Sequence, residues 1–216
     1  MTPFEPLTGI AVPMPQPNID TDAIIPSRAI RGIGREGLAE GLFANWRYLP
    51  GGLELNPGFV LNRPEYAGAQ ILLGGANFGC GSSREQAVWA LQEFGFRAVI
   101  APGFGDIFRR NCINNGLLPV VMPAEAVTAM ARWVEEKPQW HKLRINLQAG
   151  SILPSEGCPA WLGETLHKTR IELDDDEREM LLRGIDPIDL TLRRLGDDLD
   201  EFEKRHLGKY WYLRNS

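Results

Sequence analysis

The part of the chain between residues 70 and 136 has the most regular pattern of hydrophobic and polar positions. Short apolar runs alternate there with stretches in which apolar residues return at helical spacing, as Ala87, Leu91 and Phe94 do. This alternation predicts an α/β core in which neighbouring strands run parallel. Strands are expected at 70–74, 97–102 and 117–123, and helices at 84–94, 105–114 and 124–136.

The N-terminal third has shorter apolar runs that proline and glycine interrupt. GIAVP at 9–13 and AIIP at 23–26 predict two short strands. Residues 37–46 favour a short helix, although two glycines weaken it. Residues 50–64 are rich in glycine, proline and asparagine and predict a loop.

The C-terminal third begins with short segments and ends with a helical pattern. The segments 143–147, 151–154 and 169–173 predict antiparallel strands separated by turns. An apolar seam with 4-3-4-3 spacing then predicts a helix, which Gly196 interrupts. The seam consists of Ile188, Leu192, Leu195, Leu199 and Phe202. We expect it to pack against the chain's own core, and a groove that receives a partner helix is the alternative.

Charge is unevenly distributed along the 216 residues. Residues 172–205 carry thirteen acidic and six basic side chains, a local net charge of −7, whereas the whole chain carries −5. We therefore expect a single domain over 1–216 with an acidic helical C-terminal region at 172–205. The negative net charge argues against nucleic acid as a partner.

Composition narrows the class of protein further. No stretch approaches the run of about 18 apolar residues that spans a membrane, and the first residues, MTPFEPLTG, lack the features of a signal peptide. A cytoplasmic protein without a membrane partner is expected. Three widely spaced cysteines (Cys80, Cys112 and Cys158) offer no disulfide framework and no ligand spacing for zinc or an iron–sulfur cluster. We expect the chain itself to bind no metal and no cofactor.

The glycine-rich segment 74–86, GGANFGCGSSREQ, is the strongest candidate for chemistry. It lacks the third glycine of a dinucleotide fingerprint, the Gly-Lys-Ser/Thr of a phosphate loop and the G-x-S-x-G of a nucleophile elbow. Ser82 followed by Glu85 fits a capping box at the start of a helix. A cap alone does not account for Gly79, Gly81 and Arg84 together.

These residues predict an anion site. Gly79 and Gly81 would let the backbone approach a ligand, and the free N–H groups of a helix start favour an anion. Arg84 is unfavourable for the helix dipole in the first turn, so a ligand explains it better than stability does. The hydroxyls of Ser82 and Ser83 beside Arg84 also suggest proton transfer, because backbone donors and a guanidinium can stabilise a serine anion. We expect a serine that removes a proton next to a carboxylate held by the arginine.

Longer segments resemble a known family. NFGCGSSREQAVWAL resembles the G-x-G-S-S-R-E-H segment of the swivelling domain in the aconitase superfamily. Three further segments, in the same order, resemble the bacterial small subunits of 3-isopropylmalate dehydratase: NIDTDAIIP, GLFANWRYL and VIAPGFGDIFRRNCINNGLLPV. The resemblance covers residues 7–195 and implies a three-layer β/β/α swivelling domain.

The resemblance also implies a function. The chain would be the small subunit of a hydro-lyase that converts 2-isopropylmalate into 3-isopropylmalate through 2-isopropylmaleate, a step of leucine biosynthesis. A large subunit would be its partner and would bind a [4Fe–4S] cluster through its own cysteines. The substrate would be a small dicarboxylate.

Residue by residue, the resemblance places the catalytic base on Ser82. Ser83 and Arg84 match positions that bind the substrate carboxylate and stabilise the serine anion. Asp20 and Asp22 fall on a D-T-D turn, for which we expect a structural or hydrogen-bonding role.

The stretch SRAIRGIG after Pro26 resembles a loop that approaches the variable side chain of the substrate. Ile30, Arg31 and Ile33 are therefore candidates for specificity, and an exposed loop is the alternative interpretation.

One residue departs from the family pattern. Gln86 stands where the family usually has histidine after S-S-R-E, and an amide cannot titrate near neutral pH. This leaves open a small subunit of a related dehydratase that acts on a methyl-substituted malate or another 2-hydroxy diacid. A non-catalytic, anion-sensing binding module is the alternative from a different class.

Overall fold

The computed structural model describes residues 1–30, 34–155 and 157–209, apart from the side chain of residue 197. Its larger sheet is parallel and has the strand order β2-β3-β4-β5. The strands span β2 Ala11–Met14, β3 Ile71–Gly74, β4 Ala98–Ala101 and β5 Leu118–Val121. All of their residues are buried except Val121, which confirms the predicted parallel core.

The smaller sheet is antiparallel and has the order β1-β6-β7. Its strands are β1 Leu7–Gly9, β6 Leu143–Asn146 and β7 Ser151–Pro154. The predicted strands at 143–147 and 151–154 are confirmed. The apolar run at 9–13 divides at Ile10, because the residues before it join the smaller sheet and those after it join the larger one.

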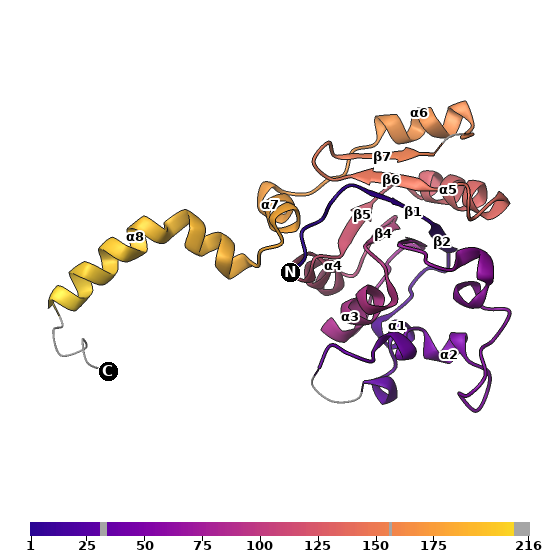
Figure 1. Ribbon diagram of the computed structural model, residues 1–216, viewed down its shortest axis with the longest axis horizontal. Coiled ribbons are helices and arrows are strands. Elements are labelled where there is room, and N and C mark those ends of the chain that lie inside the picture. The colour runs from indigo at the N-terminus through magenta and orange to yellow at the C-terminus, as the bar shows by residue number, and fades with distance from the viewer. Residues whose placement is uncertain (31–33, 156, 210–216) are drawn as a thin grey trace.

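The helices of the core were also predicted correctly: α3 Glu85–Phe94, α4 Asp106–Asn115 and α5 Ala124–Glu136. Figure 1 shows the smaller sheet on one side of the larger sheet and α3 on the other, which is the expected β/β/α order of layers. A helix that the sequence did not predict, α6 Ala160–Lys168, lies outside β7.

Two predicted strands are wrong. Residues 23–26 do not form a strand, because the Asp20 carboxylate accepts a hydrogen bond from the N–H of Ala23 (2.7 Å) and starts the short helix α1, Thr21–Ile24. Residues 169–173 form no strand either. The N–H of Ile171 donates to the carbonyl of Gly150 (3.0 Å), which lies in a turn rather than in a neighbouring strand.

The predicted helix at 37–46 is broken into two turns. A 3₁₀ turn, η2, spans Ala39–Gly41, and the short helix α2 spans Ala44–Arg47. Phe43 lies between them with φ at 49°, a left-handed conformation that a continuous helix excludes. Three more 3₁₀ turns occur nearby: η1 Ser27–Ala29, η3 Val60–Asn62 and η4 Pro64–Tyr66.

The acidic C-terminal region forms two helices, α7 Asp175–Arg183 and α8 Pro187–Lys209. Asp174 and Glu177 form a capping box at the start of α7. Both oxygens of Glu177 also accept hydrogen bonds from Arg109 of α4, at 2.5 and 2.7 Å. This bidentate ion pair holds α7 against α4.

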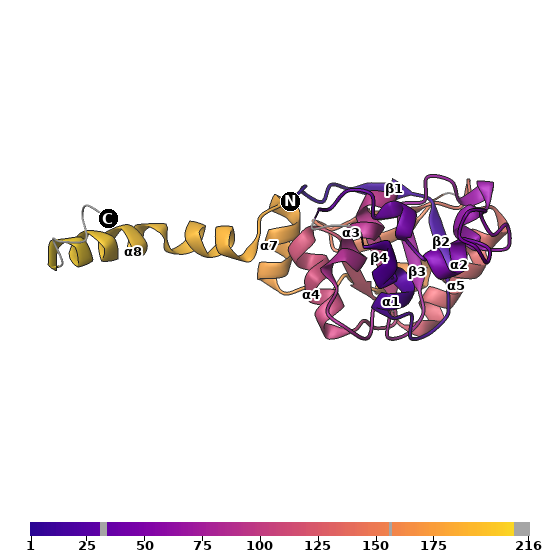
Figure 2. The same ribbon diagram turned by 90° about the horizontal axis from the view of Figure 1, so that it is seen from below.

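Helix α8 extends away from the body in both views (Figures 1 and 2). All five residues of the apolar seam are exposed, so the prediction that the seam packs against the chain's own core is wrong. The physical reason is that α8 contacts α7 through its opposite side, where Leu190 is buried and Arg194 pairs with Asp176 of α7. Among the described residues, no helix combines the length and the hydropathy needed to cross a membrane.

Candidate functional site

The glycine-rich segment runs from the end of β3 to the start of α3 and is fixed by backbone hydrogen bonds to two neighbouring segments. The N–H of Phe78 donates to the carbonyl of Gly103 (3.0 Å), and that of Gly79 donates to the carbonyl of Ile19 (2.7 Å). The N–H of Thr21 donates in turn to the carbonyl of Cys80 (2.9 Å). The carboxyl ends of β2, β3 and β4 are therefore held together at one edge of the sheet, where open α/β sheets bind their ligands.

Two glycines turn this segment toward the surface. Gly79 has φ at 72°, and a Cβ there would lie 2.2 Å from Cγ of the buried Phe108. Gly81 has φ at 92° and has more room, since Cβ of Asp20, at 3.5 Å, is the nearest atom to a Cβ added there. Gly79 thus lies against the core with its N–H in use, whereas Gly81 is exposed. Substrate binding by either glycine stays a prediction.

The two serines are available for chemistry. The side chains of Ser82 and Ser83 are exposed, and within the described residues neither hydroxyl has a hydrogen-bond partner. The predicted capping box is wrong, because α3 begins at Glu85 with Arg84 at its N-cap position. The carboxylate of Glu85 accepts instead from Asn115 of α4 (2.7 Å). Ser82 is therefore free of the structural role that the sequence offered for it.

The D-T-D turn supports both the serine and the arginine. The hydroxyl of Thr21 donates to the carbonyl of Ser82 (2.9 Å), which fixes the backbone at that serine. Nη1 of Arg84 donates to the carboxylate of Asp22 and lies 3.4 Å from the carbonyl of Ile25. Together with the cap that Asp20 provides for α1, these contacts confirm the structural and hydrogen-bonding role expected of Asp20 and Asp22.

The guanidinium of Arg84 keeps donors for a ligand. Its side chain is 20% exposed, and only Nη1 is engaged by the described residues. Nε and Nη2 form the edge that binds a carboxylate with two parallel hydrogen bonds. The N–H groups of Gly81, Ser82 and Ser83 also lack acceptors within the described part of the chain. Hydroxyls, open N–H groups and a guanidinium edge thus lie on four consecutive residues, 81–84, directly before α3.

A buried amide that the sequence analysis did not single out holds α3 against α4. Asn115 is 6% exposed, and its Nδ2 donates to Glu85 while its Oδ1 accepts from Nε1 of Trp89 (2.9 Å). Nε2 of Gln92 donates to the carbonyl of Asn115 (2.7 Å). The position of Asn115 directly before the helix-ending Gly116 was the signal in the sequence. Gln86 directly follows Glu85 on the first turn of α3 and is partly buried.

The predicted specificity segment begins beside Arg84. Ile30 is partly buried against the core, whereas Arg31 and Ile33 lie outside the described residues. Beyond them, the carboxylate of Glu93 in α3 accepts from the N–H groups of Gly37 (2.6 Å) and Ala39 (2.8 Å). Burial raises the pKa of the Glu93 carboxyl, but these backbone donors outweigh burial and hold the pKa below its ordinary value.

The cysteines of this chain do not fit an iron–sulfur cluster. Cys112 is fully buried, and burial raises the pKa of its thiol well above the ordinary value, which opposes the thiolate that a metal requires. Burial also raises the pKa of Cys158. Cys80 lies in the glycine-rich segment, and the described residues bring no three metal-binding side chains together around it.

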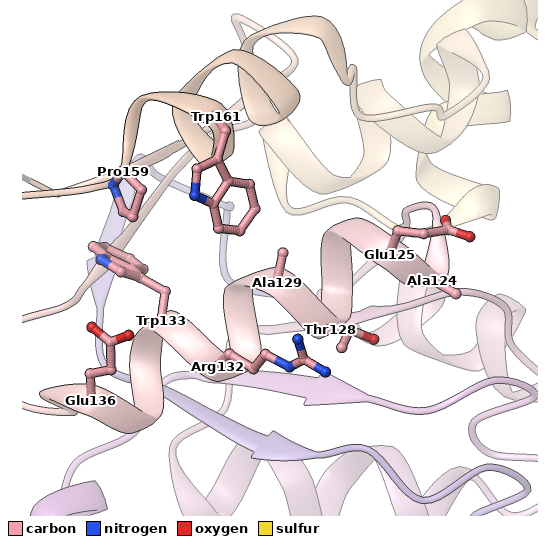
Figure 3. Close-up of a pocket in the computed structure, with 9 residues that line it drawn as sticks. All are labelled: Ala124, Glu125, Thr128, Ala129, Arg132, Trp133, Glu136, Pro159 and Trp161. Atoms are coloured by element: carbon pink, nitrogen blue, oxygen red, sulfur yellow. The ribbon is translucent and has the colours of Figure 1, made fainter.

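The candidate site is an exposed surface rather than an enclosed pocket. A groove of about 610 Å³ lies elsewhere, between α5 and the start of α6, and is lined by Arg132, Trp133 and Trp161 among others (Figure 3). Ser82 and Arg84 do not line it. Exposed serines beside a partly exposed arginine are what one half of a shared site would present.

Comparisons with known proteins find relatives over most of this chain. The model of the aconitase C-terminal domain matches residues 1–125. The 3-isopropylmalate dehydratase small subunit of Cupriavidus necator is 52% identical over 204 residues, 94% of this chain and 93% of that protein. The small subunit of Dechloromonas aromatica is 43% identical over 98% of this chain and 99% of that protein.

A solved structure is similar as well. The crystal structure of 3-isopropylmalate dehydratase from Methanocaldococcus jannaschii superposes with a TM-score of 0.58 and is 29% identical. The similarity covers 90% of this chain and 99% of that one.

Proposed function

Because the chain belongs to the family of 3-isopropylmalate dehydratase small subunits, with the fold of the aconitase C-terminal domain, we propose that it carries the serine base and the carboxylate-binding arginine of that enzyme. The reaction is the isomerisation of 2-isopropylmalate to 3-isopropylmalate through 2-isopropylmaleate, in leucine biosynthesis in the cytoplasm. A large subunit completes the enzyme.

One observation carries this proposal: the hydroxyl of Ser82 is exposed and has no partner among the described residues, and in the chain it lies between Gly81, whose N–H is open there, and Arg84. A serine hydroxyl is a poor base, because its alkoxide is far less stable than the neutral form. Each unit by which the pKa falls requires about 1.4 kcal/mol of preferential stabilisation of the anion. The N–H groups of residues 81–83, the start of α3 and Arg84 are groups able to supply it.

The roles of Ser82, Ser83 and Arg84 in the reaction follow from that arrangement. Arg84 binds a substrate carboxylate through Nε and Nη2, and Ser83 donates a further hydrogen bond to it. Ser82 removes the proton from the adjacent carbon, and the electron pair forms the double bond as the hydroxyl leaves the neighbouring carbon. Hydroxide then adds to the carbon that lost the proton, and Ser82 gives its proton to the carbon that lost the hydroxyl, so the proton and the hydroxide that left are both returned. Ile30, Arg31 and Ile33 remain our candidates for contact with the isopropyl group.

We assign the [4Fe–4S] cluster implied by the family to the large subunit, because the cysteines of this chain do not fit one. The open surface around Ser82 supports this division of the site between two chains. No step assigned to Ser82, Ser83 or Arg84 requires a metal ligand from this chain.

The proposed function is tested by mixing the chain with the large subunit of the same organism and measuring turnover. We expect 2-isopropylmalate to be converted with a kcat/KM at least about tenfold above that of 2-methylmalate, since each methylene in an apolar pocket is worth about 1–3 kcal/mol. Preference for the methyl-substituted acid would contradict the assignment and indicate the related dehydratase. Absence of turnover with either acid would indicate a binding module.

A second test concerns the residue that positions Arg84. The substitution Asp22→Asn removes the charge that orients the guanidinium, so we expect KM for 2-isopropylmalate to rise about tenfold with little change in kcat, which is the pattern of lost ground-state binding. Steady-state kinetics of the two-subunit enzyme measure both constants. The exposed acid Glu54, changed to Gln, is the matched control and should leave them unchanged. An unaltered KM in the Asp22 variant would remove Asp22 from substrate binding.

A further inference from the structure

The apolar seam of α8 has no cover within the described chain. Ile188 and Phe202 are 70% and 57% exposed, and the three leucines between them are also exposed. A helix that exposes a continuous apolar stripe is stabilised mainly by packing that stripe against another surface. The stripe is therefore an apolar face that the described chain leaves uncovered.

The contacts of α8 with its own chain hold this face outward. Leu190 is buried, and Arg194 forms ion pairs with Asp176 (2.7 Å) and Glu179 (3.1 Å) of α7. At 100° per residue, Leu190 and Arg194 project from the side of α8 opposite the seam. The helix is thus held by the side opposite the seam. A rotation of α8 that buried the seam against the rest of the chain would break these contacts.

The charges beside the seam select against a second copy of this chain. Asp189, Asp198 and Glu203 flank the seam and are exposed. In a parallel pair of helices Asp198 would approach Glu203 of the other copy, and in an antiparallel pair centred on Leu195 Asp189 would approach Glu203. Like charges are brought together in both arrangements, which disfavours self-pairing.

We propose that the apolar seam of α8 docks the large subunit, in an apolar groove flanked by lysine and arginine side chains. This inference rests on the proposed function, because that function supplies the partner. The seam supplies the apolar contact. The acidic residues beside it fix how α8 is aligned along the groove and disfavour a second copy of this chain. Helix α8 would then hold the two halves of the shared site together from a position outside that site.

The test compares two double variants of the full chain for binding to the large subunit. The change Leu192→Ser with Leu199→Ser removes apolar contact at positions that are 50% and 41% exposed, so the free chain should keep its stability. We expect the dissociation constant, measured by isothermal titration calorimetry, to rise about 30-fold. The matched control, Arg193→Ser with Asp200→Ser, has the same spacing on the other side of α8 and leaves the net charge unchanged. It should alter the constant by less than about twofold.

A charge variant tests the flanks. Asp198→Lys with Glu203→Lys should weaken binding more than the control, and added salt should weaken binding by the wild-type chain. Equal affinity of the seam variant and the control would overturn the proposal. A wild-type chain that sediments as a dimer, and becomes monomeric in the seam variant at unchanged affinity for the large subunit, would assign the seam to a second copy instead.

The two proposals fail differently. Binding that depends on the seam, without turnover of 2-isopropylmalate, would support the docking face and contradict the proposed function. Turnover of 2-isopropylmalate with an affinity for the large subunit that the seam variant does not change would support the proposed function and contradict the docking face.

Discussion

Replacing Ser82 by alanine is expected to lower the turnover of 2-isopropylmalate by about 10²–10⁴-fold, the range over which a positioned general base contributes. The hydroxyl has no partner among the described residues, so its removal should cost the folded chain nothing measurable. Initial rates of the two-subunit enzyme, with the large subunit in excess, measure the effect.

The controls for Ser82→Ala separate chemistry from assembly. The affinity of the variant for the large subunit and its melting temperature should equal those of the wild-type chain. Ser83→Ala, one residue away and also exposed, should lose only about tenfold, because it removes one hydrogen bond to a charged carboxylate. Wild-type turnover by the Ser82 variant would exclude this hydroxyl as the base.

The substitution Gly79→Ala should lower the free energy of unfolding by about 3 kcal/mol. A left-handed backbone costs a residue with a Cβ about 1–2 kcal/mol, and the new methyl group would overlap the ring of Phe108, which adds about 1–3 kcal/mol. Denaturation by urea at unchanged slope measures the loss.

Gly81→Ala is the matched control, since Gly81 also has a positive φ but a Cβ added there would make only ordinary van der Waals contacts. It should cost about 1–2 kcal/mol, the backbone part alone. Trimming the ring by Phe108→Leu in the Gly79→Ala chain should cost less than it does in the wild-type chain, because it relieves the overlap. Equal losses at the two glycines would show that contact with Phe108 is not the reason for Gly79.

The fold was predictable where periodicity is long and uniform. The helices between residues 70 and 136 follow from helical spacing over 10 to 13 residues, and the four-residue strands between them follow from apolar runs. Predictions of short elements failed where a single residue changed the local structure. The carboxylate of Asp20 turned an apolar run into α1, and the conformation of Phe43 divided the helix expected at 37–46.

The site was predictable in its residue types but not in its connections. The composition of 74–86 and the family resemblance indicated Ser82, Ser83 and Arg84. The spacing of Ser82 and Glu85 suggested a cap, yet Glu85 bonds Asn115, thirty residues further along the chain. The pairing of Arg84 with Asp22 joins positions 62 residues apart. Such pairs depend on the order of the strands, which local sequence patterns do not encode.

The exposure of the apolar seam was unpredictable for a related reason. Its 4-3-4-3 spacing specifies a helix with one apolar face but does not say which molecule covers that face. The side chains that orient α8, Leu190 and Arg194, lie off the seam and are ordinary in the sequence.

The segment 27–36 is held at both ends by hydrogen bonds, so its sequence can be replaced without moving its neighbours. Arg84 contacts the carbonyl of Ile25 just before the segment, and the carboxylate of Glu93 accepts from the N–H of Gly37 just after it. Arg84 is the N-cap residue of α3 and Glu93 lies within α3, so this one helix holds both ends of the segment. Loops whose ends are fixed tolerate changes of length and sequence at little cost in free energy. A segment from a relative with another substrate could therefore be grafted between Pro26 and Gly37 while Ser82 stays in place. Under the proposed function, a changed segment would alter contact with the variable side chain of the substrate and leave Ser82 in place.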